Sequence, residues 1–360
     1  MAVAVKYGWL TDEPVLTPEG TLVTTDGGAT VARRVLDMFP GSSLLLPTPG
    51  KAVDHEVVTL EDLDPSTLVI NLDVIDSVGV FQRLHRSGAE PRIMNFQWIN
   101  PSTFHHPVNF AAMGLSYAMF PTFCAGERTA SEVREVTRKW CVPSLADRAR
   151  IAWADLGVRT ERVRPRQHTD VPVVLYPAVS TVERKQPQAF VEIVEAVAKQ
   201  TPIKVEARLN TTALASETAM YLSRQKWAAV RPLAKGKEEY WDALSRTTAF
   251  VGTATEEAYG LEYVELLLAG AVGILPDRAW ARRLVPEGYP FLYTSKGQAE
   301  QMLLRAVTSP DACRAEVDAV AAKALGSASA AGAIQAWIES NHNVEDFDDQ
   351  FKAQVTEWFG

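Results

Sequence analysis

Residues 251–277, VGTATEEAYGLEYVELLLAGAVGILPD, predict a strand, a loop, a helix and a second strand in that order. The residues from Ala249 onward are small, β-branched or apolar, which is typical of a buried strand that ends at the polar triplet 255–257. Apolar residues then recur at helical spacing as far as Gly270, which favours a helix that stops there. The residues of this apolar face are Leu261, Val264 and Leu268. The run 271–275 predicts the second strand.

Two glutamates in this stretch indicate a binding site. Glu265 falls inside the apolar stripe of the predicted helix, where a carboxylate is costly unless something binds it. Glu257 lies just before the N-terminus of the same predicted helix. Two glutamates at this separation also occur by chance, so a plain amphipathic surface helix is the alternative interpretation. The apolar strand before them and the sequence GAVGILPD after them favour the site.

Residues 257–265, EAYGLEYVE, resemble the E-x7-E signature, usually written E-x-F-G-L-x-x-x-E, of the retaining GT-B glycosyltransferases in the group-1 glycosyl transferase family. In that family the first Glu and the amides of the Gly-Leu pair hold the donor sugar and its phosphate, and the second Glu binds the ribose. The resemblance implies a sugar and phosphate site at Glu257, Gly260 and Leu261, and a ribose site at Glu265. Amides at a helix N-terminus suit a diphosphate, and a ribose diol offers two donors to a carboxylate.

A second match to the family lies earlier in the chain. Residues 173–176 predict a strand, and the loop 177–185 ends at Lys185. In the family this loop carries an Arg and, a few residues later, a Lys, which together neutralise the donor diphosphate. Lys185 matches the Lys, whereas Ser180 stands at the Arg position. Either Arg184 substitutes for the missing Arg, or the protein holds the phosphate more weakly.

The composition indicates an ordinary globular protein. The 360 residues are 47% apolar and 22% charged, which suggests about two domains. The three cysteines, Cys124, Cys141 and Cys313, have no C-x-x-C spacing, so we expect neither a disulfide frame nor a zinc site. No apolar run reaches the roughly 18 residues of a membrane span. We therefore expect a soluble, cytoplasmic protein with no metal and no bound cofactor.

The N-terminal half shows strands alternating with helices. Residues 1–20 have a hairpin-like pattern, and residues 21–25 predict a strand that runs through the Gly27-Gly28 turn into a helix at 32–39. The family opens with a similar Gly-Gly loop, where glycine lets the backbone approach a phosphate. Gly27 and Gly28 are thus candidate donor contacts, although a Gly-Gly pair also forms a simple tight turn.

Further strands and one helix cap are predicted in this half. The strand alternating with helix implies a mostly parallel sheet. The predicted strands cover 43–46, 67–72, 92–98 and 115–120. The last of them leads into a loop at 121–128, after which Thr129 and Glu132 have the spacing of a capping box for the next helix.

The loop 99–107 follows the predicted strand 92–98 and is polar and aromatic. Ligands bind at the carboxyl ends of strands in open α/β sheets, so this loop is a candidate site. It contains His105 and His106, which we take as candidate catalytic residues because family members often place a histidine in this region. Helix capping or loop packing is the alternative for both histidines. Trp98, at the end of the strand, is a candidate acceptor contact.

A basic segment indicates a further acceptor hypothesis. Residues 128–166 hold ten Arg or Lys against five Asp or Glu, although the whole chain has a net charge of −8. Arg134 and Arg138 share a face of the predicted helix there. In length and domain organisation the chain also resembles the phage enzymes that glucosylate hydroxymethylated DNA bases. Trp98, Arg134 and Arg138 are therefore candidate contacts to a DNA acceptor. A solvated helix face with a small-molecule acceptor is the alternative.

The aperiodic, proline-containing segment 163–172 marks a domain boundary. We expect a GT-B fold, with two Rossmann-like domains separated by a cleft. The N-terminal acceptor domain covers 1–165, and the C-terminal nucleotide-sugar domain covers 172–333. The helical tail 334–360 is expected to cross back onto the N-terminal domain, as the last helix does in the family.

The predicted function is transfer of a sugar from a nucleotide diphosphate, such as UDP, to an acceptor hydroxyl with retention of configuration. The partners are therefore a nucleotide sugar and either a small molecule or DNA, and the oligomeric state stays open. A nucleotide-sugar epimerase and a non-catalytic nucleotide-binding protein on the same fold are the alternatives. A dinucleotide-dependent oxidoreductase is disfavoured because no G-x-G-x-x-G follows any predicted strand.

Overall fold

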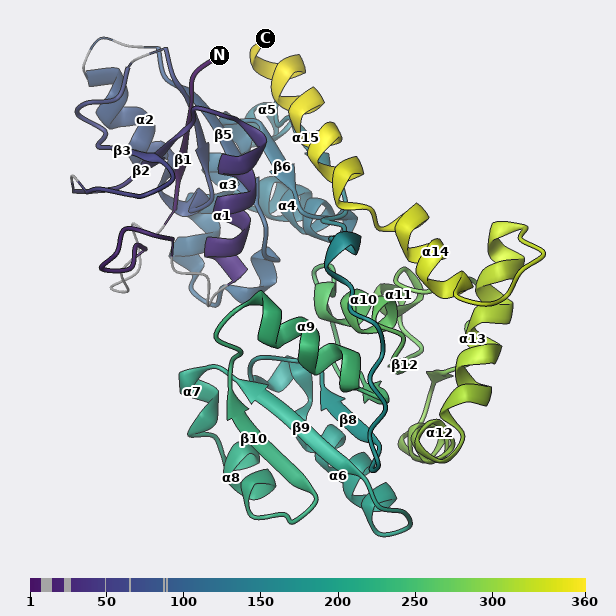
Figure 1. Cartoon of the computed structure of the whole chain (residues 1–360). Coiled ribbons are helices and arrows are strands. Elements are labelled where there is room, and N and C mark those ends of the chain that lie inside the picture. The colour runs from purple at the N-terminus through teal and green to yellow at the C-terminus, as the bar shows by residue number, and fades with distance from the viewer. Residues whose placement is uncertain (8–14, 23–26, 49, 65, 87, 89) are drawn as a thin grey trace. The chain divides into compact units, whose positions relative to one another are not determined.

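The computed structural model describes residues 1–7, 15–22, 27–48, 50–64, 66–86, 88 and 90–360. The chain forms two compact units. Unit 1 consists of residues 1–156 and 345–360, and unit 2 consists of residues 157–344. Each unit is a Rossmann-like parallel sheet covered by helices, as the alternation of strand and helix predicted (Figure 1). Among the described residues, no helix has both the length and the apolar character needed to span a bilayer.

Within its described residues, unit 1 holds a seven-stranded parallel sheet in the order β3-β2-β1-β4-β5-β6-β7. The central strands are buried on both faces, as parallel strands covered by helices must be. The strands are β1 Val3–Lys6, β2 Ser43–Leu45, β3 Glu56–Val58, β4 Leu68–Asn71, β5 Arg92–Gln97, β6 Thr122–Cys124 and β7 Ile151–Trp153. The helices are α1 Gly27–Met38, α2 Ser77–Arg86, α3 Pro107–Met119, α4 Glu127–Trp140, α5 Pro143–Ala146 and α15 Val344–Phe359, with the short 3-10 helices η1 Val74–Asp76 and η2 Pro101–Thr103.

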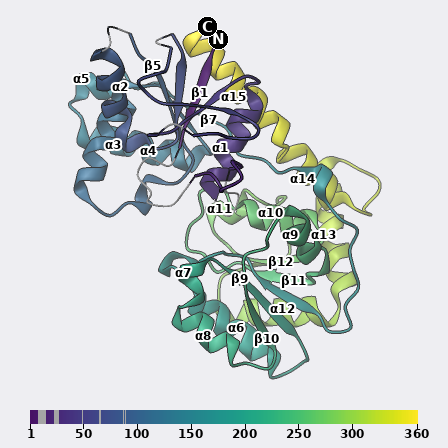
Figure 2. The same ribbon diagram turned by 60° about the vertical axis from the view of Figure 1, so that its left-hand side comes forward.

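The last helix of the chain completes the core of unit 1. Helix α15 lies beside the unit 1 sheet (Figures 1 and 2). Its Phe347, Phe351 and Val355 are fully buried in the core that includes Phe96 of β5 and Phe123 of β6. The ring of Phe351 lies 5.1 Å from that of Phe96 and 4.9 Å from that of Phe123, with both pairs edge to face. Such aromatic pairs add to the free energy gained by apolar burial. The C-terminal segment therefore crosses back to the first unit, as predicted.

One strand prediction in unit 1 is wrong, and another falls mostly outside the described residues. Residues 115–119 form the end of α3 and Phe120 is its C-cap, whereas the neighbouring strand is β6, inside the predicted loop 121–128. Short apolar runs do not distinguish a strand from a buried helix, and here Pro107 starts a helix that continues through the run. The opening strand is β1, within the segment predicted as hairpin-like. Of the strand predicted at 21–25, Leu22 forms only an isolated bridge to Leu16, and residues 23–25 lie outside the described residues.

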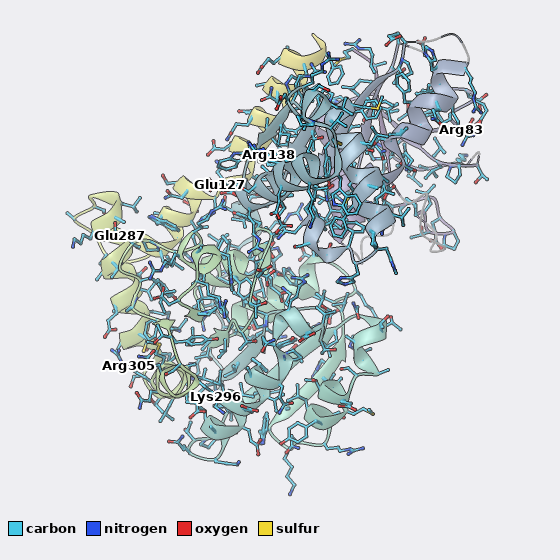
Figure 3. All side chains as sticks on the ribbon, turned by 180° about the vertical axis from the view of Figure 1, so that it is seen from behind. Arg83, Glu127, Arg138, Glu287, Lys296 and Arg305 are labelled. Atoms are coloured by element: carbon cyan, nitrogen blue, oxygen red, sulfur yellow. The ribbon has the colours of Figure 1, made fainter. Side chains whose placement is uncertain are left out.

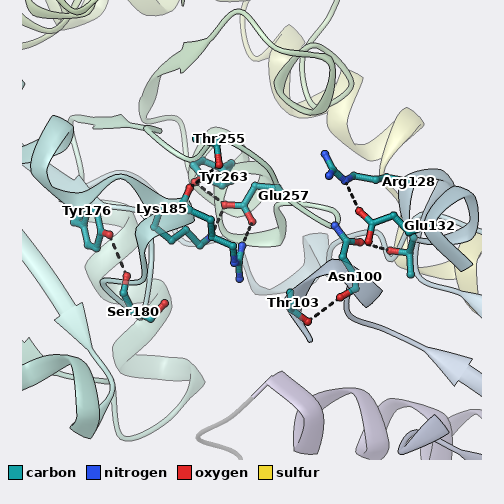
Figure 4. Close-up of polar contacts among 12 residues, drawn as sticks. Asn100, Thr103, Arg128, Glu132, Tyr176, Ser180, Lys185, Thr255, Glu257 and Tyr263 are labelled. Carbon is teal, nitrogen blue, oxygen red and sulfur yellow. Dashed lines mark hydrogen bonds and ion pairs between the residues drawn. The ribbon is translucent and has the colours of Figure 1, made fainter. Parts of the chain in front are cut away.

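The predicted capping box is also wrong. Helix α4 begins at Glu127, two residues before Thr129. The Thr129 hydroxyl donates instead to Asn100 Oδ1, at 2.7 Å. The Glu132 carboxylate accepts a 2.9 Å hydrogen bond from the amide of Ser102 and pairs with Arg128 at 3.1 Å (Figure 4). Both side chains therefore fasten the loop after β5 to α4 rather than capping the helix.

All of residues 157–344 are described, and they hold a six-stranded parallel sheet in the order β10-β9-β8-β11-β12-β13. The strand predicted at 173–176, the strand from Ala249, the helix that stops at Gly270 and the strand predicted at 271–275 are confirmed as β8, β11, α10 and β12. The strands are β8 Val173–Tyr176, β9 Lys204–Leu209, β10 Ala228–Pro232, β11 Ala249–Val251, β12 Val272–Pro276 and β13 Leu292–Tyr293. The helices are α6 Pro187–Ala198, α7 Thr211–Leu214, α8 Glu217–Ser223, α9 Lys237–Arg246, α10 Leu261–Leu268, α11 Ala279–Arg282, α12 Lys296–Thr308, α13 Pro310–Leu325 and α14 Ala333–Asn341, with η3 Thr160–Arg162 and η4 Glu183–Lys185.

The chain enters and leaves unit 2 at two segments that are hydrogen-bonded to each other. The amide of Val158 donates to the carbonyl of His342 at 2.7 Å, and the amide of Val344 donates to the carbonyl of Val158 at 3.3 Å. The helical tail is consequently divided at His342, whose Nδ1 lies 2.8 Å from the hydroxyl of Tyr259. The first part, α14, belongs to unit 2, and α15 belongs to unit 1.

Candidate functional site

The topology of unit 2 brings two loops together at one edge of its sheet. Strand β8 lies between β9 and β11, so the chain leaves β8 toward one side and β11 toward the other. Ligands of open α/β sheets bind outside the carboxyl ends of the strands at such a switch point. The loops after β8 and β11 are joined there, because the amide of Thr255 donates to the carbonyl of Arg184 at 2.8 Å and the hydroxyl of Thr253 donates to the carbonyl of Lys185 at 2.8 Å.

The polar contacts at this edge of the sheet converge on Glu257. Its side chain is only 7% exposed, and Oε1 accepts a 3.0 Å hydrogen bond from the hydroxyl of Tyr263. The ammonium of Lys185 pairs with the same oxygen, and the guanidinium of Arg184 lies 3.5 Å from Oε2 (Figure 4). A buried carboxylate is tolerated only when it is paired and hydrogen-bonded. The structure thus brings together the three charged residues that the sequence proposed for sugar and diphosphate binding.

Helix α10 begins beside this cluster because of Gly260. Its φ of +94° lies in the left-handed region, which glycine adopts without strain. A Cβ at this position would lie 2.8 Å from Cδ1 of Leu284, so the packing also favours glycine. Leu261 is the first residue of the helix and is partly exposed. The unpaired amides and positive dipole end of α10 therefore lie next to Glu257, which makes this end suitable for an anion.

Glu265, the second glutamate of the motif, has a partner from another helix. It is half-buried, and its Oε2 accepts a 2.5 Å hydrogen bond from the hydroxyl of Tyr240 on α9. Burial raises the pKa of Glu265 from 4.5 to about 7, while Tyr240 and the cations Arg162 and Lys237 oppose the rise. The carboxylate in the apolar stripe thus has a hydrogen-bond donor within the protein, the hydroxyl of Tyr240. Its contact with a ribose stays a prediction.

Glu262 is a carboxyl group that the motif did not single out. It lies in the first turn of α10, is half-buried, and has no hydrogen-bond or ion-pair partner among the described residues. Burial raises its pKa from 4.5 to about 8, with further repulsion from Glu265 and Glu257 and an opposing attraction from Lys185. The sequence signal that could have singled out Glu262 was the presence of three glutamates within nine residues, of which only two matched the family motif.

Ser180 contributes its backbone rather than a charge. The hydroxyl of Tyr176, at the end of β8, donates to the carbonyl of Ser180 at 3.0 Å (Figure 4). This bond shapes the first part of the loop after β8, and the positive charge of the loop comes from Arg184 and Lys185 in η4. Replacement of the family's Arg by Arg184 therefore stays a proposal, supported by the ion pair to Glu257.

In unit 1, the two candidate glycines open helix α1. Gly27 is its first residue, and the preceding residues 23–26 lie outside the described residues. A Cβ on Gly28 would lie 2.5 Å from the phenol ring of Tyr7. The close approach of Tyr7 is thus one physical reason for glycine at this position. A contact between this pair and a donor stays a prediction.

The other candidates in unit 1 are separate side chains. His105 and His106 are exposed between η2 and α3, and neither side chain has a hydrogen bond among the described residues. Trp98 is half-buried against the core. On α4, Arg134 is half-buried and Arg138 is exposed (Arg138 is labelled in Figure 3). Neither has an ion pair in the described part of the chain. His106 does not cap α3 with its side chain, so the capping interpretation is wrong for that residue.

A buried lysine marks the corresponding edge of the unit 1 sheet. Lys6 ends β1, which lies between β2 and β4 at the switch point of this sheet. Its side chain is fully buried, and Nζ lies 3.1 Å from Asp73 Oδ2 and 2.8 Å from Asp76 Oδ2. Asn71 extends the network with a 3.0 Å hydrogen bond to Asp76. Sequence reasoning missed this buried lysine, although a lysine at the end of an apolar run was a signal for it.

Comparisons of the sequence with models of protein families and with curated proteins find no match. Solved structures do match. Sucrose-phosphate synthase from Thermosynechococcus elongatus is similar with a TM-score of 0.67 and 11% identity over 99% of each chain. The E. coli trehalose-6-phosphate structure bound with UDP-2-fluoro glucose has a TM-score of 0.68 and 10% identity, again over 99% of each chain.

A third similar structure is larger than this chain. TarM of S. aureus, solved with UDP, has a TM-score of 0.58 and 12% identity over 81% of this chain, which spans only 55% of the TarM chain. At these identities the likeness establishes the fold alone. The fold is that of the GT-B glycosyltransferases, two Rossmann-like domains in one chain, as the motif predicted.

Proposed function

We propose that the protein is a glycosyltransferase that takes a sugar from a nucleotide diphosphate bound by unit 2 and transfers it to an acceptor hydroxyl bound by unit 1. The observation that carries this proposal is the pairing of Lys185 and Arg184 with Glu257 beside the amino end of α10. Two cations and a helix N-terminus attract a diphosphate, and a buried carboxylate accepts hydrogen bonds from sugar hydroxyls. Similar folds solved with UDP or a UDP sugar support the choice of ligand.

In this proposal each residue has one task. Lys185 and Arg184 neutralise the diphosphate together with the amides of Gly260 and Leu261. Glu257 then accepts hydrogen bonds from the sugar, and Glu265 accepts them from the ribose diol in place of Tyr240. The gain in rate comes from positioning and from stabilising the charge that grows on the departing diphosphate.

We further propose transfer with retention of configuration. The departing diphosphate can accept the proton of the acceptor hydroxyl on the face of the sugar that it leaves, so no second carboxylate at glycosidase spacing is required. Retention follows from the E-x7-E resemblance at Glu257 and Glu265. The measurement is the anomeric configuration of the product by NMR, and an inverted product would contradict the assignment.

A small molecule is the acceptor class we favour. Four of the ten basic residues in the segment that suggested DNA have acidic neighbours within the protein. Arg128 pairs with Glu132, Arg159 and Arg162 lie near Glu161, and Arg164 pairs with Glu238. The part of this segment from residue 157 onward also belongs to unit 2, which is the proposed donor unit. At the switch point of unit 1, Asp73 and Asp76 share the single cation Lys6, which leaves a charge of −1 that disfavours a polyanion.

A panel of nucleotide sugars tests the donor proposal. A true donor is expected to raise the melting temperature by mass action and to give nucleoside diphosphate when a hydroxyl acceptor is present. Conversion of the sugar without acceptor would instead identify an epimerase. Binding with no turnover on any acceptor would identify a non-catalytic nucleotide-binding protein.

The DNA alternative is tested by salt. Transfer to duplex DNA containing 5-hydroxymethylcytosine would weaken steeply as ionic strength rises, because binding through several phosphates releases counterions. Arg134→Ala/Arg138→Ala would reduce that slope. We expect no transfer to this DNA at low salt with the complete donor panel, and salt-dependent transfer would overturn the small-molecule assignment.

A further inference from the structure

Unit 2 contains a cavity of about 150 Å³ that the proposed reaction does not use. Its walls come from the start of β12, from α13 and from the start of α14, together with Gly270 and Arg166. Strand β12 begins at Val272, so the cavity lies at the amino edge of the sheet. Glu257 and Lys185 lie at the carboxyl edge. The cavity is therefore separate from the candidate donor site.

Two arginines line this cavity, and both have unused hydrogen-bond donors. Arg314 on α13 pairs through Nη2 with Asp311, but its Nη1 is buried without a hydrogen-bond partner among the described residues. Arg166 donates through Nη1 to the carbonyls of Thr247 at 2.8 Å and Ala269 at 3.4 Å. Its Nε and Nη2 have no protein acceptor in the part of the chain that the structure describes. The buried Nη1 of Arg314 is costly without an acceptor, so an acceptor from outside the protein is stabilising there.

The two guanidinium groups also repel each other. Burial, and after it the charge of Arg314, lower the pKa of Arg166 from 12.5 to about 10, against an opposing effect of Asp311. An anion between the two groups removes this repulsion and supplies the missing acceptors. Guanidinium groups bind planar carboxylates with two parallel hydrogen bonds.

The remaining lining decides the charge and shape of that anion. Asp318 is the acidic residue of the lining, and its carboxylate already accepts from the amides of Gly332 at 3.3 Å and Ile334 at 3.0 Å. The lining itself carries two cations and one anion, a charge of +1 that one carboxylate neutralises, while Asp311, the partner of Arg314 Nη2, lies outside the lining. Apolar walls at Val272, Val317 and Ile334 favour an apolar body on the ligand. A dry cavity of about this volume in another protein holds benzene.

We propose that this cavity binds a small organic monocarboxylate with an apolar body of roughly benzene size, held by Arg166 and Arg314. Arg166 also contacts the carbonyl of Ala269, which follows the last residue of α10. The bound carboxylate thus lies at the end of the helix that is opposite to Glu257. The site is independent of the identity of the proposed donor and acceptor.

The test is calorimetric titration of the full chain with sodium benzoate, with inorganic phosphate as the comparison. We expect saturable benzoate binding that is tighter than phosphate binding and that UDP does not displace. Arg314→Gln removes the guanidinium whose Nη1 is buried without a partner and should weaken benzoate binding at least about tenfold. Circular dichroism verifies that the variant is folded.

Arg305→Gln is the matched control, because Arg305 on the neighbouring helix α12 pairs with Glu316 and does not line the cavity (Figure 3). This variant should bind benzoate like the parent protein. The proposal is overturned if benzoate does not bind saturably, if UDP displaces it, if phosphate binds more tightly, or if the Arg314 and Arg305 variants bind benzoate equally.

Discussion

At the scale of single residues, the candidate donor site holds more acid than base. Three glutamates, Glu257, Glu262 and Glu265, lie on or beside α10, and Lys185 and Arg184 are the cations that pair there. Each glutamate has a different surrounding: Glu257 is ion-paired, Glu265 accepts from a tyrosine, and Glu262 is unpaired among the described residues. Carboxyl groups in such different surroundings titrate and bind differently. Substitutions at these positions should therefore have separable effects.

The first prediction separates donor binding from turnover. Lys185→Ala should lower kcat about a hundredfold, because the charge that it stabilises grows during departure of the diphosphate. Glu265→Ala should instead weaken binding of the nucleotide about tenfold, since a ribose contact is equal in ground and transition states. Steady-state kinetics and titration with UDP measure the two effects. If both variants stay within about twofold of the parent in both quantities, the donor site lies elsewhere.

The second prediction concerns pH. The pKa values of Glu265 and Glu262 are raised to about 7 and about 8, so the folded protein holds protons there that the unfolded chain loses near 4.5. The free energy of unfolding contributed by these groups is therefore fully present below about 4.5 and is lost as pH rises through 7 and 8. Glu262→Gln cannot ionise, so its melting temperature should fall less between pH 6 and 9.

The expected difference at pH 8.5 is about 2–4 °C in favour of Glu262→Gln, corresponding to about 1 kcal/mol in a domain of this size. Glu287→Gln is the control, because Glu287 is exposed and its charge can be removed without changing a buried group (Figure 3). Parallel melting curves for Glu262→Gln and the parent across this range would show that Glu262 is ionised in the folded protein at neutral pH.

At the scale of elements, the start of α10 depends on one backbone angle. Gly260 has φ +94°, and its neighbours Tyr263 and Leu284 leave no room for a Cβ. The third prediction is that Gly260→Ala destabilises unit 2 by about 1–2 kcal/mol, the cost of a left-handed conformation for an L residue. It should also weaken nucleotide binding, because the amides of the first turn shift.

Gly236→Ala is the control for this prediction. Gly236 precedes α9 as Gly260 precedes α10, but its φ is −179° and no atom lies within 4 Å of an added Cβ. A urea titration of both variants measures the free energy of unfolding. Equal stability of the two variants would mean that the loop before α10 adapts without cost.

At the scale of the whole molecule, the chain returns to unit 1 after completing unit 2. The side chains of α15 that enter the unit 1 core are separated from their partners in β5 and β6 by the whole of unit 2 in sequence. Unit 1 is therefore complete only when the last residues of the chain are in place. Contacts over such long sequence separations form late in folding, because closing the intervening loop costs entropy.

The fourth prediction follows from this return. Phe351→Ala should destabilise unit 1 by about 3–5 kcal/mol, the usual cost of removing a buried phenylalanine side chain. Lys352→Ala, an exposed neighbour on α15, should have little effect. Hydrogen exchange read by mass spectrometry locates the change: amides of β5 and β6 should lose protection, and those of β8 and β11 should keep it. Equal loss in both units would mean that they unfold as one.

The sequence by itself determined the middle strands of the unit 2 sheet and the helix that bears the motif. The pattern of the apolar residues predicted β8, β11, α10 and β12, because each has a glycine or proline at or just after its end. The grouping of Glu257 with Lys185 was also predicted, although only through resemblance to a family. Local sequence sufficed here because strand, loop and helix follow one another within about 30 residues.

Other features were decided only by the tertiary structure. Strand β1 is four residues that end in a lysine, and Lys6 is buried because Asp73 and Asp76, far along the chain, pair with it. The apolar pattern of residues 115–120 fits a strand and a helix equally well. Packing of α3 against α4 selects the helix. Glu265 meets Tyr240 from another helix, and two arginines from distant segments share a cavity. A buried charge is determined by its partners, and no local period specifies which distant residues those are.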